Sequence, residues 1–229
     1  MSTRTVAGAV TTSQRPREGA DADTSRLETF SDGVLAIVIT LLALGIEVPP
    51  ASAALGQELL GLWPSYLAYA VSFLLIGAIW VNHHAMFRYI VRADSTLLVL
   101  NLLHLMVVAF MPFSTAVLAQ AFLRGTDEPI AAAFYGAVLA VGGVFVNAMW
   151  RYAAHEHRLL GPGVTDAQIR SMDQRFLAGP VLYVIATIVG LVAPWLALLL
   201  YVALIAFYLF LPARGDRDVP NSGNAQGDN

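Results

Sequence analysis

Hydrophobic residues run along this chain in long stretches separated by short polar ones. Six such stretches lie at about residues 29–48, 62–88, 95–122, 128–157, 174–192 and 195–212. Each is close to or above the roughly 20 residues with which a helix crosses about 30 Å of hydrocarbon. Because lipid offers the backbone no hydrogen-bonding partner, such stretches cross as helices. The pattern predicts an all-α, polytopic membrane protein with six transmembrane helices per subunit.

The ends of the chain and two breaks within it set the expected domain boundaries. Pro49-Pro50 ends the first span, and the break at residues 190–194 divides the fifth span from the sixth. Residues 1–25 and 213–229 are small and polar, and the first segment has no apolar core of the kind a signal peptide requires. We expect two disordered cytoplasmic tails, 1–25 and 213–229, on either side of a six-helix transmembrane domain, 26–212.

Composition agrees with a membrane protein and excludes cysteine chemistry. The chain is 57% hydrophobic and 13% charged, whereas soluble domains carry about 25% charged residues. With no cysteine, it has no disulfides, no thiolate metal site and no cysteine nucleophile. Alternate connections are rich in arginine, which predicts a plasma membrane protein with both termini cytoplasmic. These arginines are Arg4, Arg15, Arg17, Arg26, Arg88, Arg92, Arg151, Arg158, Arg170, Arg175, Arg214 and Arg217, and the opposite face has only Arg124.

Few ionisable residues lie inside the spans, and three of them are compatible with more than one function for the protein. A charge near the bilayer centre costs about 2.5–3.5 kcal/mol on insertion scales, so Asp32, His83 and His104 mark a buried network or a site. One alternative is a proton-coupled secondary transporter that uses these residues as a relay. Against it, the sequence shows no internal repeat and no matching pair of broken helices. Another is a haem or metal enzyme with His83 and His104 as ligands.

The first span divides into two faces. At about 100° per residue, Ile37, Thr40, Leu41 and Leu44 fall within an arc of about 100°, and Asp32 lies about 140° from Ile37. The stripe alone is typical of any packed membrane helix. Asp32 faces neighbouring helices instead, and a polar network with the second span is geometrically plausible there.

Two motifs resemble those of a known channel family. The run Arg26-Leu-Glu-Thr-Phe30-Ser31-Asp32 is similar to the RxxxFSD signature of the TMEM175-type potassium channels, and Trp80-x-Asn82-His83-His84-x-x-Phe87 resembles the second-helix pattern of their bacterial members. The resemblance implies a homotetramer in the lipid bilayer with the first helices around a central pore. It implies no enzymatic activity, no cofactor, no metal site and no nucleic acid partner.

The same resemblance assigns roles to individual residues. It implies a potassium-selective cation channel, with proton permeation left open and potassium ions as the permeant species. The narrowest apolar ring of that family's pore corresponds to Ile37. Leu41 and Leu44 correspond to further apolar layers, and Thr40 to a residue that contributes to ion selectivity. It also implies a structural network that ties the first helix to the second. By position the network comprises Arg26, Phe30, Ser31, Asp32, Trp80, Asn82 and His83.

Overall fold

The chain folds as a bundle of long helices, seen in a computed structural model that describes residues 18–50 and 54–210. The described residues form no β-strand, and the only β-type pairing among them is an isolated bridge between Ile90 and Leu160. The elements, in chain order, are α1 (Glu18–Leu41), η1 (Leu42–Gly45), α2 (Leu55–Gly61), α3 (Trp63–Phe87), α4 (Ser95–Ala109), α5 (Met111–Arg124), α6 (Glu128–Ala154), η2 (His155–His157), α7 (Asp166–Gly190) and α8 (Pro194–Phe210).

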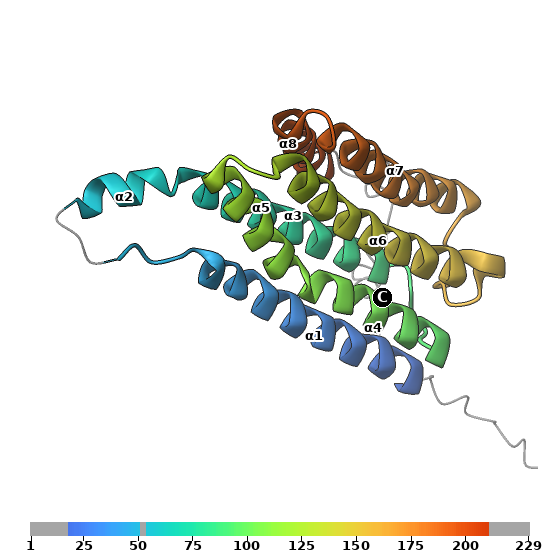
Figure 1. The fold of residues 1–229 in the computed structure, drawn as a ribbon. Helices are drawn as coiled ribbons and strands as arrows, with labels where there is room; N and C mark the ends of the chain where they lie inside the picture. The colour runs from blue at the N-terminus through green and yellow to red at the C-terminus, as the bar shows by residue number, and fades with distance from the viewer. Residues whose placement is uncertain (1–17, 51–53, 211–229) are drawn as a thin grey trace, which may run out of the picture.

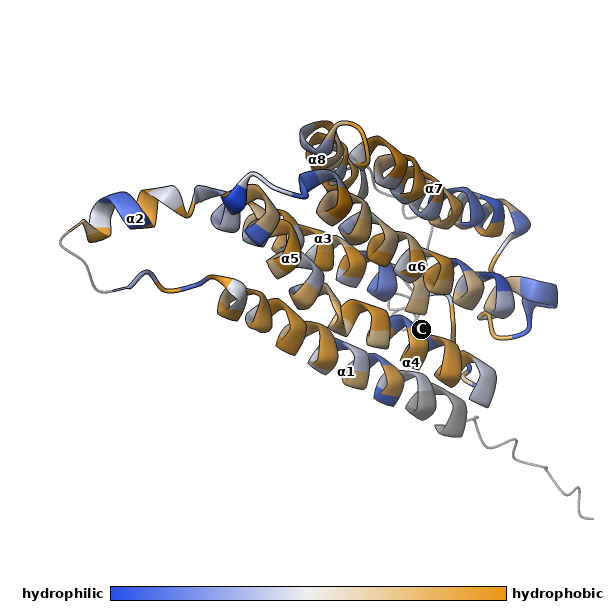
Figure 2. Ribbon diagram, in the orientation of Figure 1, coloured by the Kyte–Doolittle hydropathy of each residue, from blue (hydrophilic) through white to orange (hydrophobic). Residues whose placement is uncertain are grey.

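The expected all-α membrane fold is confirmed, with five helical segments among the described residues that are long and apolar enough to cross a bilayer. They are Thr24–Gly45, Trp63–Phe87, Ser95–Arg124, Glu128–His157 and Asp166–Gly190. The sixth expected span corresponds to α8, which is shorter. Figure 2 shows hydrophobic residues along the middle of the helices and hydrophilic ones gathered near their ends.

Three boundaries differ from those expected. The third span is two helices, because Pro112 lacks the amide hydrogen that a continuous helix needs, and α4 and α5 meet at Phe110. α1 begins at Glu18, so residues 18–25 of the expected N-terminal tail are helical. α7 begins at Asp166, where a capping box between Thr165 and Gln168 satisfies the first free amides. Residues 1–17 of the expected N-terminal tail and the whole expected C-terminal tail, 213–229, lie outside the described residues.

The helices form layers with α1 at one side and α7 and α8 at the other (Figure 1). α1 packs on α3, α4 and α5, and α6 packs on α4, α5, α7 and α8. The buried core runs through the bundle and includes Leu75, Tyr135, Ala186 and Tyr201. α1 is therefore a peripheral helix in a single copy of the chain, with one face on the bundle and one face free.

One end of the bundle is closed by a clasp between two connections, which we define as residues 88–94 and 155–165. Backbone amides of Val91 and Arg92 donate to the carbonyl of Leu159, and Gly161 donates to the carbonyl of Tyr89. Asp94 caps α4 by accepting from the Leu97 amide. The clasp holds the α3–α4 connection against the α6–α7 connection.

Candidate ion pathway and the polar network behind it

α1 has two faces of opposite character. Leu35, Val38 and Leu42 are buried in the bundle, each no more than 2% exposed. On the other side Ile37 is 60% exposed and Leu44 is 79% exposed. Leu41 and Thr40 share this open face. The four residues expected to line a pore therefore form one continuous stripe, apolar except for the Thr40 hydroxyl, that no described helix of the same copy covers.

Thr40 is the one hydroxyl on that stripe. Its Oγ1 donates to the carbonyl of Ile37, 2.7 Å away. The donor is thus used within the helix, which leaves the lone pairs of the oxygen to face whatever lies along the stripe. A hydroxyl held in this way presents an electron-rich oxygen, the ligand type that hard cations prefer.

A seam of polar pairs joins α1 to α3. Trp80 Nε1 donates to Asp32 Oδ1 at 2.9 Å. One turn away, Glu28 Oε2 lies 3.9 Å from His84 Nδ1, an ion pair when the histidine is protonated. The indole of Trp80 also stacks on the His84 ring, with centroids 6.1 Å apart. Because each helix supplies residues four apart, the two pairs lie side by side along antiparallel helices.

A second group of polar residues ties α1 to both α3 and α4 inside the bundle. Ser31 Oγ donates to the carbonyl of Leu27 and accepts from Asn101 Nδ2 at 2.9 Å. Asn101 Oδ1 accepts from His83 Nε2, also at 2.9 Å. Ser31, Asn101 and His83 are each at most 1% exposed. This chain, which we call the Ser31 network, fixes the rotation of α1 on the bundle because a buried polar group without its partner is costly.

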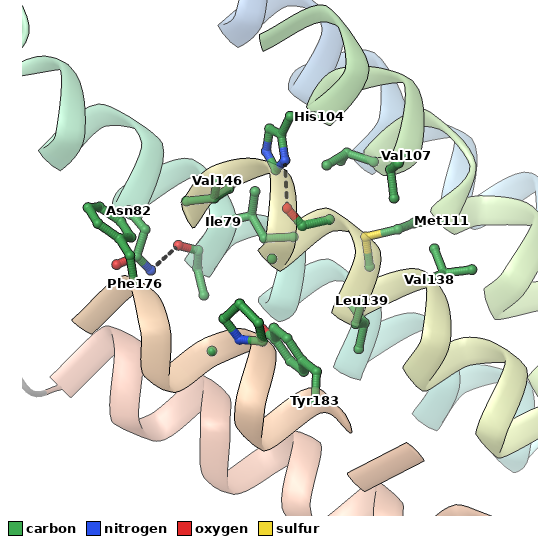
Figure 3. A pocket seen from close by; sticks show the side chains of 16 residues that line it. Ile79, Asn82, His104, Val107, Met111, Val138, Leu139, Val146, Phe176 and Tyr183 are labelled. Atoms are coloured by element: carbon green, nitrogen blue, oxygen red, sulfur yellow. Dashed lines mark hydrogen bonds between the residues drawn. The ribbon is translucent and has the colours of Figure 1, made fainter. Parts of the chain in front are cut away.

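A third group lies deeper, around a cavity of about 50 Å³ in the middle of the bundle. Figure 3 shows His104 at one end, donating from Nδ1 to the carbonyl of Gly142 at 3.2 Å, and Asn82 donating to the carbonyl of Ala78. Arg175 Nε of α7 donates to Asn82 Oδ1 at 2.9 Å. The remaining wall is largely apolar and comes from α3, α4, α5, α6 and α7. Asn82 therefore connects α3 to α7.

The structure thus distributes the residues expected in one network over three groups. Asp32 meets Trp80, Ser31 reaches His83 through Asn101, and Asn82 meets Arg175. Arg26 is exposed, and no hydrogen bond or ion pair joins it to another described residue. Phe30 is 54% exposed and lines an open groove between α1 and α4.

Sequence reasoning missed four participants: Glu28, His84, Asn101 and Arg175. The spacing of four between Glu28 and Asp32, matched by Trp80 and His84, is the signal that could have found the first two. Asn101 lies three residues before His104 on the same helix, but it bonds across helices to Ser31 and His83. Nothing in the pattern connects Asn82 to Arg175, which is 93 residues away.

The two buried histidines do not converge on a common ligand. The rings of His83 and His104 are stacked, with centroids 6.3 Å apart and planes 11° apart. Each ring already uses one nitrogen, toward Asn101 and toward Gly142. Among the described residues no group of three metal-ligating side chains occurs. Asp32 lies in a different group from both histidines, so the three residues do not form a hydrogen-bonded relay.

A family model described as the endosomal/lysosomal potassium channel TMEM175 matches residues 26–112, which hold α1 from Arg26 onward, the seam and the Ser31 network. A potassium channel from Chamaesiphon minutus is 39% identical over 180 residues, covering 77% of this chain and 88% of the relative. A potassium channel from Streptomyces collinus is 40% identical over 194 residues, covering 82% of this chain and 92% of the relative.

A solved structure agrees with these relatives. It is the crystal structure of a lysosomal potassium-selective channel TMEM175 homolog from Chamaesiphon minutus. It matches 82% of this chain and 97% of its own length, with 35% identity and a TM-score of 0.75. Sequence, length and fold agree with one another, and the chain belongs to the TMEM175 family of ion channels, not to a family of enzymes.

Proposed function

We propose that this chain is the subunit of a passive, potassium-selective channel in which four copies surround a central pore lined by α1. The observation that carries the proposal is the open apolar stripe of α1. Polar contacts from Asp32, Ser31 and Glu28 fix α1 on the bundle. Its open stripe is apolar except for the Thr40 hydroxyl, and such a stripe suits contact with other copies. Family membership names the activity, since the relatives described above are called potassium channels.

In this arrangement Ile37 forms the narrowest ring. Four isoleucine side chains around an axis exclude water and obstruct hydrated ions, so permeation requires the ring to widen. Leu41 and Leu44 add further apolar layers toward the outer end. Thr40, whose hydroxyl proton is held by the Ile37 carbonyl, offers its oxygen to a partly dehydrated cation. Asp32 does not line the pore in this arrangement, and its hydrogen bond from Trp80 holds α1 against α3.

The orientation follows from the arginines. The end with the clasp carries Arg88, Arg92 and Arg158, so it faces the cytoplasm, and the turn between α7 and α8 faces outward. Both termini are then cytoplasmic, α8 is the sixth span, and the chain is a multi-pass protein of the plasma membrane. No cofactor is required, and the permeant species is potassium.

The test is a flux assay on the full chain reconstituted in liposomes, with a potassium gradient and then a sodium gradient. Wild type should dissipate the potassium gradient faster than the sodium gradient. Ile37→Asn should change the rate or the ion preference several-fold, because a polar ring no longer expels water. Ile188→Asn is a matched control, since Ile188 on α7 is 61% exposed and Ile37 is 60% exposed.

Unchanged flux in both Ile37→Asn and Ile37→Cys would remove this residue from the pore. Saturating uptake driven by a pH gradient, without single-channel openings, would instead favour a transporter. Tetramer assembly is measured separately, by light scattering of the purified protein in detergent.

A further inference from the structure

The cavity beside His104 contains a polar atom that the channel architecture does not use. Nδ1 of the imidazole donates to the Gly142 carbonyl at 3.2 Å. Nε2 of the same ring is buried and has no hydrogen-bond partner among the described residues. The side chain is only 1% exposed. Because a buried polar atom without a partner costs free energy, an unmatched nitrogen on a residue that lines a cavity indicates that its partner occupies the cavity.

The bond to Gly142 decides what kind of partner His104 needs. A carbonyl only accepts hydrogen bonds, so Nδ1 carries the proton. None of the described residues that line the cavity is acidic, so a charged imidazolium would have no counter-ion there and the ring is neutral. In a neutral imidazole the second nitrogen is an acceptor. Nε2 therefore requires a hydrogen-bond donor.

Pro180 adds a second acceptor to the same cavity. It lies inside α7 and has no amide hydrogen, so the Phe176 carbonyl lacks the donor that a continuous helix supplies four residues along. Pro180 and Phe176 both line the cavity. In membrane helices such a carbonyl is satisfied by a neighbouring side chain or an ordered water. Both unmatched groups are acceptors, so the molecule that completes them is a donor.

The size and the wall of the cavity restrict the occupant further. Its volume of about 50 Å³ corresponds to about three to five water-sized positions. Figure 3 shows the apolar side chains of Val107, Met111 and Val138 on one side of it. Asn82 and Phe176 lie on the other side. A buried water needs about two to four polar partners, which the apolar side does not offer, so this part of the volume suits carbon.

We propose that the cavity is a binding site for a small uncharged molecule with a hydroxyl group, whose O–H donates to Nε2 of His104. Water is one source of this hydroxyl, and an alcohol of about two to four carbons is the other. In the alcohol the alkyl part lies against the apolar side of the cavity. The residues that line the site all come from one copy, so the site does not depend on assembly around a pore.

Methionine methyl groups report on the cavity from within the full chain. The protein is labelled with ¹³C at these methyl groups, and NMR spectra are recorded in detergent, with the signals assigned by Met→Leu variants. Met111 lines the cavity and is 1% exposed. Met149 is 0% exposed and does not line the cavity, so it reports general effects on the fold. Met106 is 60% exposed and reports alcohol dissolved in the detergent.

The two probes are isopropanol and acetone, which share a carbon skeleton but differ in that only isopropanol has an O–H. Isopropanol should shift the Met111 signal in a saturable way and leave Met149 unchanged. Acetone should need about a fivefold higher concentration for the same shift, because it cannot donate to Nε2. His104→Asn keeps an amide donor for the Gly142 carbonyl but has no atom in the place of Nε2. In this variant the affinity for isopropanol should fall about fivefold, to that for acetone.

Water is identified in the same protein without either probe. Magnetisation transfer from water to the Met111 methyl group, absent at Met149 and lost in His104→Asn, together with no saturable shift by isopropanol, would assign the hydroxyl to water and support the site. A saturable shift by isopropanol that is weaker with acetone would show that an alcohol fits the site as well.

Four results would overturn the inference. Equal affinities for isopropanol and acetone in wild type, or equal affinities for isopropanol in wild type and His104→Asn, indicate an apolar void without a hydroxyl site. Parallel, non-saturating shifts at Met111 and Met106 indicate alcohol that is merely dissolved in the detergent. A Met111 methyl group that senses neither alcohol nor water indicates a dry cavity. The comparison of the two probes uses wild-type protein alone, so it decides the inference even if His104→Asn fails to fold.

Discussion

The α6–α7 hairpin and α1 belong to the same bundle but differ in how closely they are packed. α6 and α7 approach so closely that glycines are needed where they meet: a Cβ at Gly136 would lie 2.4 Å from both Thr187 Oγ1 and Tyr201 Oη. α1, by contrast, is fixed by a strip of buried leucines and a few polar contacts, and half of its surface is open. The comparison indicates that α6–α7 completes its packing within one copy, whereas α1 leaves one face open in a single copy, as the proposed assembly requires.

The largest loss of stability is expected where α6 and α7 pack too closely to accept a side chain. In Gly136→Val the new side chain meets the Thr187 backbone as well as two hydroxyls, and Thr187 Cα is only 3.1 Å from the Cβ position. Overpacking at a rigid contact should cost about 3 kcal/mol or more. We expect little folded protein in detergent by size-exclusion chromatography. Gly142→Ala on the same helix is the control, because its nearest neighbour, Val107 Cγ1, is 3.6 Å away.

The two faces of α1 provide the next test. Leu35 is 1% exposed and Ile37 is 60% exposed, although they are two residues apart. Leu35→Ala should destabilise the protein by about 2 kcal/mol, at the low end for a buried leucine because lipid-facing bundles gain little from the hydrophobic effect. Ile37→Ala should leave unfolding nearly unchanged and alter potassium flux. Reversible unfolding followed by circular dichroism compares them, and equal losses of stability would contradict the two-face description.

Disrupting the Ser31 network should reduce stability less than truncating a buried leucine of α1. Asn101→Ala leaves His83 Nε2 without its partner, while Ser31 Oγ keeps only its bond to the Leu27 carbonyl. An unsatisfied buried polar group costs about 1–3 kcal/mol. The expected result is a lower unfolding temperature and less tetramer, with the potassium-to-sodium flux ratio preserved in the channels that assemble. Leu102→Ala, one residue along and 57% exposed, is the control. A changed flux ratio in Asn101→Ala would place the network at the pore.

How far the sequence predicts this molecule depends on the range of the contacts. Apolar periodicity and proline placement are local signals, so the long apolar stretches, the all-α class and the division between α7 and α8 follow from the residues alone, whereas the short helix α2 does not. The stripe around Ile37 follows from helical geometry, and its role as a pore remains a proposal. Asn82 could not be paired with Arg175 because helix order says nothing about which side chains meet 93 residues apart. The break at Phe110 was missed although Pro112 is a visible signal.

The smallest effect is expected at the clasp, which joins the α1 side of the bundle to the hairpin. Burial raises the pKa of Asp94, but hydrogen bonds from the Tyr152 hydroxyl and the Leu97 amide, together with the nearby Arg158 charge, outweigh it and leave the pKa below its ordinary value. A carboxylate with a depressed folded-state pKa stabilises the fold above its unfolded pKa, and this contribution is lost as pH falls through the folded pKa.

The unfolding temperature of wild type should therefore drop on acidification below about pH 4 more than that of Asp94→Asn, whose side chain does not titrate. Tyr152→Phe removes the strongest of these contacts, the 2.6 Å bond to Asp94 Oδ2, and should shift the acid transition of the protein toward higher pH. If Asp94→Asn and wild type lose stability in parallel on acidification, this carboxylate does not stabilise the clasp, and the clasp is held by the backbone bonds at Leu159 and Gly161.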